Sequence, residues 1–190
     1  MKIDGNAIRP EMVLEHRGRL WITTKTQHVK PGKGGAYMQV ELKDIRDGTK
    51  LNERFRSDES VERARLDEEV YQFLYQEGDA YTLMHVKTFD QIQVLRTQIG
   101  KGAVFLREGD TVKVSSYEEE IVGVSIPDTA VFTITEAEPV TKGQTATSSY
   151  RPAILENGVR IMVPPHIEIG TRVVVNTADA TYVERAKDKD

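Results

Sequence analysis

A short glycine-rich segment holds the residue whose type and setting best suit chemistry. Pro31 presets φ for position i+1 of a turn, and Gly32 accepts the positive φ that position i+2 of a type II turn requires. Lys33 then falls at i+3, and Gly34 and Gly35 follow it. The pattern predicts a thin turn from which a long primary amine projects. That amine is either a solubilising turn lysine, which is the commoner case, or a group that enters a narrow site.

Other kinds of reactive site lack the residues they need. A P-loop fails because Gln27 stands in place of its first glycine and Gly34 in place of its hydroxyl residue. The four histidines are far apart and cysteine is absent, so we expect no metal site. A nucleophilic lysine needs burial or a neighbouring cation, and a glycine-flanked Lys33 offers little burial. We therefore expect no catalytic residues, no cofactor and no enzymatic activity.

Charge is distributed unevenly along the chain. The net charge is -4, but residues 1–64 carry 13 Lys/Arg against 10 Asp/Glu, while residues 65–190 carry 13 against 20. No acidic residue lies between Glu15 and Glu41. That interval holds five cations, which are Arg17, Arg19, Lys25, Lys30 and Lys33. Such a stretch either meets RNA phosphate through Coulomb attraction or is a solvated strand face.

Composition indicates a water-soluble, cytoplasmic protein. The chain is 38% hydrophobic with a mean hydropathy of -0.46, and no apolar run approaches the roughly 20 residues that span a bilayer. We expect no membrane partner. The N-terminus lacks the apolar segment of a signal peptide, and the absence of cysteine excludes disulfides.

The predicted secondary structure consists mainly of short strands, which position the lysine and the other charges. Five runs rich in β-branched or aromatic residues predict strands at 20–24, 37–42, 70–75, 81–84 and 111–114. Closely spaced strands of this kind favour small β-barrels. One helix is expected from Ser57 to Leu66, and a polar loop is expected at 141–149.

A repeated sequence pattern, called the echo below, indicates a duplicated module. Two glycines 61 residues apart are each followed by valines at the same offsets: Gly109 with Val112 and Val114, and Gly170 with Val173 and Val175. A five-stranded oligonucleotide-binding (OB) barrel fits in about that length. A turn glycine before a strand is also a common chance match.

Two motifs in the right order resemble the elongation factor P family. Residues 30–36 resemble that family's Lys-Pro-Gly-Lys-Gly-x-Ala loop. Residues 151–170, which begin Arg151-Pro152-Ala153, resemble its C-terminal signature, although that signature usually opens with lysine. Pro165 and His166 also depart from the usual pattern. The resemblance extends over essentially the whole chain.

The resemblance implies an all-β fold of three small barrels in an L-shaped, tRNA-like arrangement. A KOW/SH3-like domain at 1–64 carries the Lys33 loop, and OB-fold domains follow at 65–127 and 128–190. It also implies a monomer that binds the 70S ribosome between the P and E sites. There it relieves stalling at consecutive prolines by positioning the CCA end of the P-site tRNA. Neither a metal nor a cofactor is implied.

The resemblance assigns roles to particular residues. Lys33, lengthened by a modifying enzyme, is the functional tip, and Pro31, Gly32, Gly34 and Gly35 shape its loop. The candidate contacts to tRNA or ribosomal RNA are Arg17, Arg19, Lys25, Lys30, Arg151, Tyr182 and Arg185. The alternatives are an elongation factor P-like paralogue and a general OB-fold RNA-binding module, which would rely on exposed aromatic side chains for base stacking.

Overall fold

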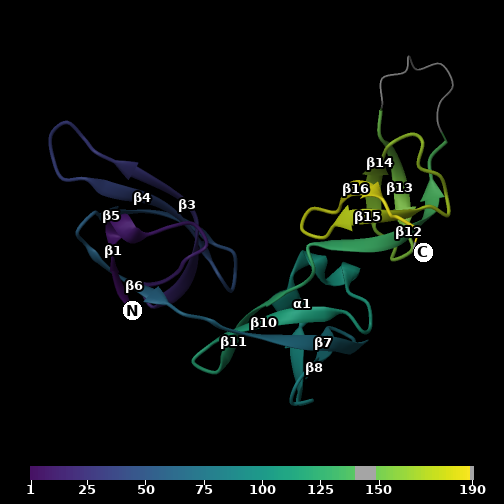
Figure 1. Cartoon of the computed structure of the whole chain (residues 1–190), viewed down its shortest axis with the longest axis horizontal. Coiled ribbons are helices and arrows are strands. Elements are labelled where there is room, and N and C mark those ends of the chain that lie inside the picture. Colours follow the sequence, from purple (N-terminus) through teal and green to yellow (C-terminus); the bar gives the residue numbers. More distant parts are fainter. Residues whose placement is uncertain (140–148, 189–190) are drawn as a thin grey trace. The chain divides into compact units, whose positions relative to one another are not determined.

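The computed structural model describes residues 1–139 and 149–188, and nearly all of its regular structure is β-strand (Figure 1). The predicted all-β class is confirmed. The strands form three sheets, of six, five and five strands. The chain divides into two compact units, residues 1–69 with 114–124 and residues 70–113 with 125–190. The loop expected at 141–149 lies, except for Ser149, outside the described residues. The boundaries expected at 64/65 and 127/128 stay predictions.

The first sheet carries the glycine-rich loop. Its order is β1-β6-β2-β3-β4-β5, and every pairing in it is antiparallel. The strands are β1 (Lys2–Asp4), β2 (Val13–His16), β3 (Arg19–Val29), β4 (Tyr37–Asp44), β5 (Lys50–Arg56) and β6 (Ser60–Ala64), with a 3-10 turn η1 at Gly5–Ala7. β3 and β4 pair from Trp21↔Asp44 to Val29↔Tyr37, and the loop 30–36 closes the far end of this ribbon (Figure 1).

Alternation along β4 explains why this ribbon is anchored at one face. Met38, Val40 and Leu42 are buried, while Gln39 and Glu41 between them point to the other face. The buried set joins a core that also contains Ile8, Leu14, Trp21, Phe55 and Val61. The ribbon is therefore fixed along its middle, and its loop end extends beyond the core.

The helix expected from Ser57 to Leu66 is wrong. The segment turns at 57–58 and then forms strand β6, which pairs with β1 and β2. Val61 and Ala64 are three residues apart, which is also the spacing of apolar residues on one face of a helix. In this strand the same spacing arises because the two side chains pack in different clusters. Val61 packs in the first core, whereas Ala64 packs with Leu20 and Val122.

The second and third sheets have the same topology. Counted along the chain within each sheet, both follow the strand order 5-4-1-2-3. The second sheet contains β7 (Asp67–Glu77), β8 (Ala80–His85), β9 (Gln91–Leu95), β10 (Thr111–Tyr117) and β11 (Glu120–Ser125), with α1 (Arg96–Ile99) and η2 (Lys101–Phe105) between β9 and β10. The third contains β12 (Thr129–Ala137), β13 (Arg151–Leu155), β14 (Arg160–Val163), β15 (Arg172–Asn176) and β16 (Thr181–Arg185).

The expected duplication is confirmed at matching hydrogen bonds. Phe73 N–H donates to Asp110 O at 2.8 Å, and Ile134 N–H donates to Thr171 O at 2.9 Å. The two glycines of the echo, Gly109 and Gly170, donate back to those same strand residues, Phe73 and Ile134, at 2.8 Å. Both glycines have positive φ, and the valines that follow them are buried. The bulges of β7 and β12 also start at these equivalent residues.

Candidate functional site

The loop between β3 and β4 is exposed from Pro31 to Gly35. The positive φ predicted for Gly32 is wrong, because the residue with positive φ is Gly34, at 113°. Residues 30–36 connect the paired Val29 and Tyr37, so the chain reversal is wider than one four-residue turn. A Cβ on Gly34 would meet only Pro31 Cγ, at 3.8 Å. Backbone conformation, rather than lack of space, therefore requires glycine at this position.

Lys33 lies at the exposed tip of this loop. Within the described residues, its ammonium makes neither a hydrogen bond nor an ion pair, and the same holds for Lys25 and Lys30 on the approach to the loop. The loop rejoins the domain at Ala36, whose carbonyl accepts Ser57 N–H at 3.0 Å. Three cations along one ribbon are thus exposed and free to meet an external anion.

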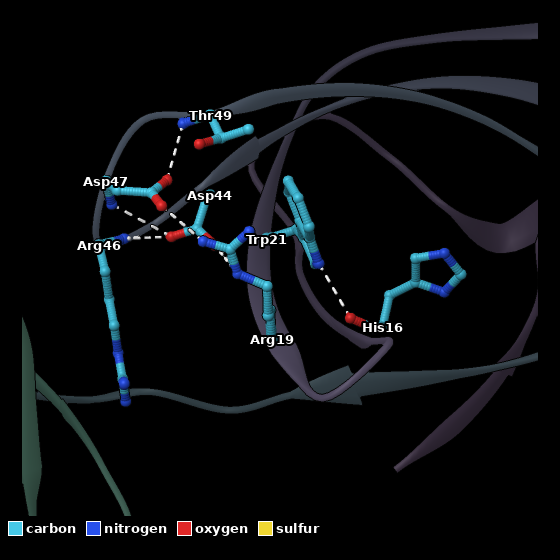
Figure 2. A network of polar contacts seen from close by, with 7 residues as sticks. All are labelled: His16, Arg19, Trp21, Asp44, Arg46, Asp47 and Thr49. Atoms are coloured by element: carbon cyan, nitrogen blue, oxygen red, sulfur yellow. Dashed lines mark hydrogen bonds and ion pairs between the residues drawn. The ribbon is translucent and has the colours of Figure 1, made fainter.

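The opposite end of the same ribbon holds its cation in a network (Figure 2). Arg19 Nε lies 2.8 Å from Asp44 Oδ2, and Arg19 Nη2 pairs with Asp47. The Arg19 guanidinium also lies 5.3 Å from the ring centroid of Trp21. Trp21 Nε1–H in turn donates to His16 O at 3.0 Å. Arg19, a candidate RNA contact, is therefore paired within the domain, with 46% of its side chain still exposed.

Two aspartates hold the turn that follows β4. Asp44 is 3% exposed, and its Oδ1 accepts Arg46 N–H at 2.8 Å and Asp47 N–H at 3.2 Å. Asp47 accepts Thr49 N–H at 2.9 Å. Hydrogen bonds from Thr49, with Arg19 beside it, lower the pKa of Asp47 from 3.8 to about 2. The sequence has the turn dipeptide Asp47-Gly48 at this point, but sequence reasoning missed Asp44. An aspartate three residues before that dipeptide was the available signal, because such a side chain bonds to the backbone ahead of it.

Arg17, another candidate contact, is also paired. It occupies a two-residue β2–β3 turn with Gly18, where φ is 52° and 73°. Positive φ at both positions indicates a type I′ turn, which matches the twist of a hairpin. Arg17 Nη2 lies 3.0 Å from Glu53 Oε2, and His16 Nε2 lies 2.9 Å from the same oxygen.

The C-terminal candidate residues fall in the third sheet and differ in exposure. Arg151 donates to two main-chain carbonyls, Glu138 O at 2.7 Å and Ile167 O, so it ties β13 to its neighbouring loops. Tyr182 packs against the third core, and this burial, with Tyr150 nearby, raises its pKa. Arg185 at the end of β16 is exposed. Of the three, Arg185 is the most accessible to a partner.

Two further observations cover the described part of the chain. Residues 1–139 and 149–188 contain no group of three or more His, Asp or Glu that lie together as ligands. Over the same residues, no helix is long and apolar enough to span a bilayer.

Three family models match consecutive parts of the chain. The elongation factor P KOW-like domain matches residues 4–61, the elongation factor P OB domain matches 66–124, and the elongation factor P C-terminal domain matches 131–185. A KOW-like domain followed by an OB domain and a C-terminal domain of this type defines an all-β translation factor.

Full-length relatives identify the family. The chain is 57% identical over 186 residues to elongation factor P of Parvibaculum lavamentivorans, a match that covers 98% of this chain and 100% of that protein. It is 53% identical over 190 residues to elongation factor P of Bartonella tribocorum, with 100% of both covered. The chain belongs to the elongation factor P family.

Solved structures extend the likeness of the fold. The eukaryotic translation initiation factor 5A from Methanococcus jannaschii matches with a TM-score of 0.55 and 22% identity, over 67% of this chain and 92% of that protein. A translation initiation factor eif-5a family protein from Naegleria fowleri matches with a TM-score of 0.52 and 14% identity, over 66% of this chain and 98% of that protein.

Proposed function

We propose that this translation factor binds the 70S ribosome between the P and E sites and presents Lys33 to the CCA end of the P-site tRNA. It acts in the cytoplasm as a monomer, and it relieves stalling at consecutive prolines by stimulating peptide-bond formation. The bond-forming chemistry belongs to the ribosome, so the factor is not itself an enzyme. The partners of its cationic surface are tRNA and ribosomal RNA.

One observation carries the proposal: Lys33 is exposed on a glycine-rich tip and unpaired within the described residues, on a ribbon anchored by the first core. A turn lysine that only improves solubility does not need a fixed support. A lysine that must reach a buried RNA end does, because the reacting groups tolerate little displacement. Well-oriented reactants gain about 7–11 kcal/mol from pre-paid entropy, and a shift of about 1 Å can cost about 100-fold in rate.

The proposal includes a covalent extension of Lys33. An ordinary lysine is short for a contact at the end of a long loop, so a modifying enzyme in the native host lengthens the side chain. The exposed tip gives such an enzyme access from several sides. Intact-mass and peptide mass spectrometry on protein purified from its own organism should show an added mass on the peptide that contains Lys33. An unmodified peptide would remove this part of the proposal.

The test of function compares two lysine variants. In a reconstituted translation system with a triple-proline template, Lys33→Ala should lose stimulation by about 100-fold. Its stability should change by no more than about 0.5 kcal/mol, since the side chain is solvated. Lys50→Ala is the matched control, because Lys50 is also exposed and lies on β5 of the same sheet. It should stimulate like the parent.

Co-sedimentation with ribosomes separates binding from stimulation. Lys33→Ala should still sediment with ribosomes, because a spread-out interface does not depend on a single charge at its margin. If Lys33→Ala stimulates as well as the parent, the lysine does not act on the reaction. If it fails to sediment, Lys33 is an anchor for binding rather than a positioning group.

A further inference from the structure

The core-facing side of the β3–β4 ribbon changes from apolar to polar toward the loop. Thr26 pairs with Val40, and His28 pairs with Met38. Directly paired residues of antiparallel strands share a face, so Thr26 and His28 lie on the face whose β4 members, Val40 and Met38, are buried. Two polar side chains thus continue this face beyond the core, Thr26 half-buried and His28 exposed. The first core does not use them.

The segment around η1 forms a second, rigid wall beside these side chains. Gly5 N–H donates to Glu59 O at 2.8 Å, and Asn6 N–H donates to Ser57 O at 3.2 Å. A Cβ on Gly5 would lie 2.2 Å from Arg56 O, so the segment packs directly against the backbone at the end of β5. This close packing fixes where the side chain of Asn6 begins.

Arg9 completes that wall in a held orientation. Its Nη1 donates to two carbonyls of its own segment, Asn6 O and Ile8 O, both at 2.8 Å. Ile8 is fully buried, which anchors the backbone beside the guanidinium. Arg9 Nε and Nη2 make no hydrogen bond within the described residues. The guanidinium is therefore preorganised, with donors left to use.

A cavity of about 420 Å³ lies between the two walls, lined by Asn6, Arg9, Thr26, His28 and Met38. None of these residues carries a carboxylate. Met38 is 4% exposed, and His28 Nε2 lies 3.3 Å from Ser57 Oγ, a contact that orients the imidazole ring. A held guanidinium, an amide and a hydroxyl suit an oxyanion, because hydrogen bonds from an ionised donor to an anion are shorter and stronger than neutral ones.

We propose that this cavity binds a phosphate group, and that the group is a phosphodiester of the RNA that the Lys33 loop approaches. Arg9 supplies the charge, and Asn6 and Thr26 supply further hydrogen bonds. His28 precedes Lys33 by only five residues, so the two lie at most about 16 Å apart at the rise of a fully extended chain. One RNA strand can therefore contact both. The identity of the ligand as RNA rests on the proposed function, whereas the existence of the anion site does not.

The first experiment uses the whole chain without ribosomes. Amide and guanidinium N–H spectra are recorded by NMR while sodium phosphate is added, with sodium chloride at equal ionic strength as reference. Phosphate should cause saturable shifts at Asn6, Arg9, Thr26 and His28 with half-saturation at about 1–10 mM, as expected for a few contacts. Arg9→Gln should weaken this binding at least about tenfold. Absent shifts, or equal shifts in Arg9→Gln, would overturn the proposal.

Arg54→Gln provides the matched control. Arg54 is also an exposed arginine of the first sheet, but it pairs with Gln39 on the opposite face, where its Nε donates to Gln39 Oε1 at 3.0 Å. Its variant should titrate like the parent. A ten-nucleotide uridine RNA should then shift the same four cavity residues. If inorganic phosphate binds there and the RNA does not, the site serves a free phosphate, and the phosphodiester assignment is wrong.

A second readout links the cavity to translation. On the triple-proline template, Arg9→Gln should raise the factor concentration for half-maximal stimulation about tenfold at an unchanged plateau. Arg54→Gln should not change it. Equal half-maximal concentrations for Arg9→Gln and the parent would overturn the role of the cavity in RNA binding. If the parent itself gives no stimulation, the proposed function fails, whereas the phosphate titration still decides whether the anion site exists.

Discussion

The two ends of the β3–β4 ribbon carry positive charge in opposite states. At the end near Trp21, Arg19 pairs with Asp44 and Asp47 and contributes to the closure of the turn after β4. At the other end, Lys30 and Lys33 extend from the core without a partner among the described residues. The five cations of the basic stretch therefore divide into two paired arginines and three unpaired lysines among the described residues.

The difference shows what a count of charges omits. A carboxylate partner offsets part of a cation's attraction for phosphate, although exposed ion pairs of this kind contribute only about 0–1 kcal/mol. The carboxylates that pair with Arg17 and Arg19 are Glu53, Asp44 and Asp47, all of which lie beyond the acid-free interval in sequence. The two arginines therefore already have partners inside the domain, whereas the lysines have none among the described residues, and the RNA contacts expected of Arg17 and Arg19 stay predictions.

The largest effect is expected at the tip. Gly34→Ala forces a non-glycine residue into positive φ, a strain of about 1–3 kcal/mol that the loop relieves by moving Lys33. Stimulation on the triple-proline template should fall at least about tenfold, since small displacements are costly. Gly35→Ala and Gly32→Ala should stay near the parent, because neither residue has positive φ nor any atom within 4 Å of a new Cβ. A harmful Gly32→Ala beside a harmless Gly34→Ala would contradict this loop geometry.

The next effect is expected at the paired end. Asp44→Ala leaves the main-chain N–H groups of Arg46 and Asp47 without their acceptor, so unfolding of the first domain should become easier by about 2 kcal/mol. Trp21 is the only tryptophan of the chain and is 4% exposed, so its fluorescence in urea reports on this domain. Asp58→Ala is the control, because the ion pair of Asp58 with Arg56 is largely exposed and should change stability by less than about 1 kcal/mol. Equal urea midpoints for the two variants would show that Asp44 does not hold the turn.

The smallest effect is a pH dependence at Asp47. Hydrogen bonds from Thr49, with Arg19 nearby, lower its pKa from 3.8 to about 2 in the folded chain. A lowered pKa means that the stabilisation is complete above pH 3.8 and is lost as the pH falls toward about 2. Asp47→Asn should therefore lower the urea midpoint of Trp21 fluorescence at pH 7 and approach the parent near pH 2. A difference that is the same at both pH values would exclude this carboxylate as the cause.

Much of the fold could be predicted from local sequence, and the failures have physical causes. The five strand runs fall inside β3, β4, β7, β8 and β10 because those runs are rich in β-branched and aromatic residues. The echo at Gly109 and Gly170 predicted a repeat that shares even its bulges. The expected helix was wrong because Val61 and Ala64 pack in different clusters, and a spacing of three does not reveal that.

The residues of the site could be predicted from the sequence, but their backbone conformation and ion pairing could not. Proline, glycines and lysine indicated an exposed tip, and Lys33 is exposed. The position of the positive φ was not accessible, because it depends on how residues 30–36 connect Val29 to Tyr37. Pairing across 25 and 28 residues, between Arg19 and its two aspartates, was equally inaccessible, because strand register decides which charges meet.

The rate of peptide-bond formation on the triple-proline template, measured against factor concentration, tests the central claim most directly. The claim is that Lys33 acts on the reaction, whereas Lys25 and Lys30 contribute to binding. Lys33→Ala should lower the maximal rate about 100-fold, with the half-saturating concentration within about threefold of the parent. The Lys25→Ala/Lys30→Ala double variant should raise the half-saturating concentration and leave the maximal rate unchanged. A Lys33→Ala factor that reaches the full rate at higher concentration would contradict the account.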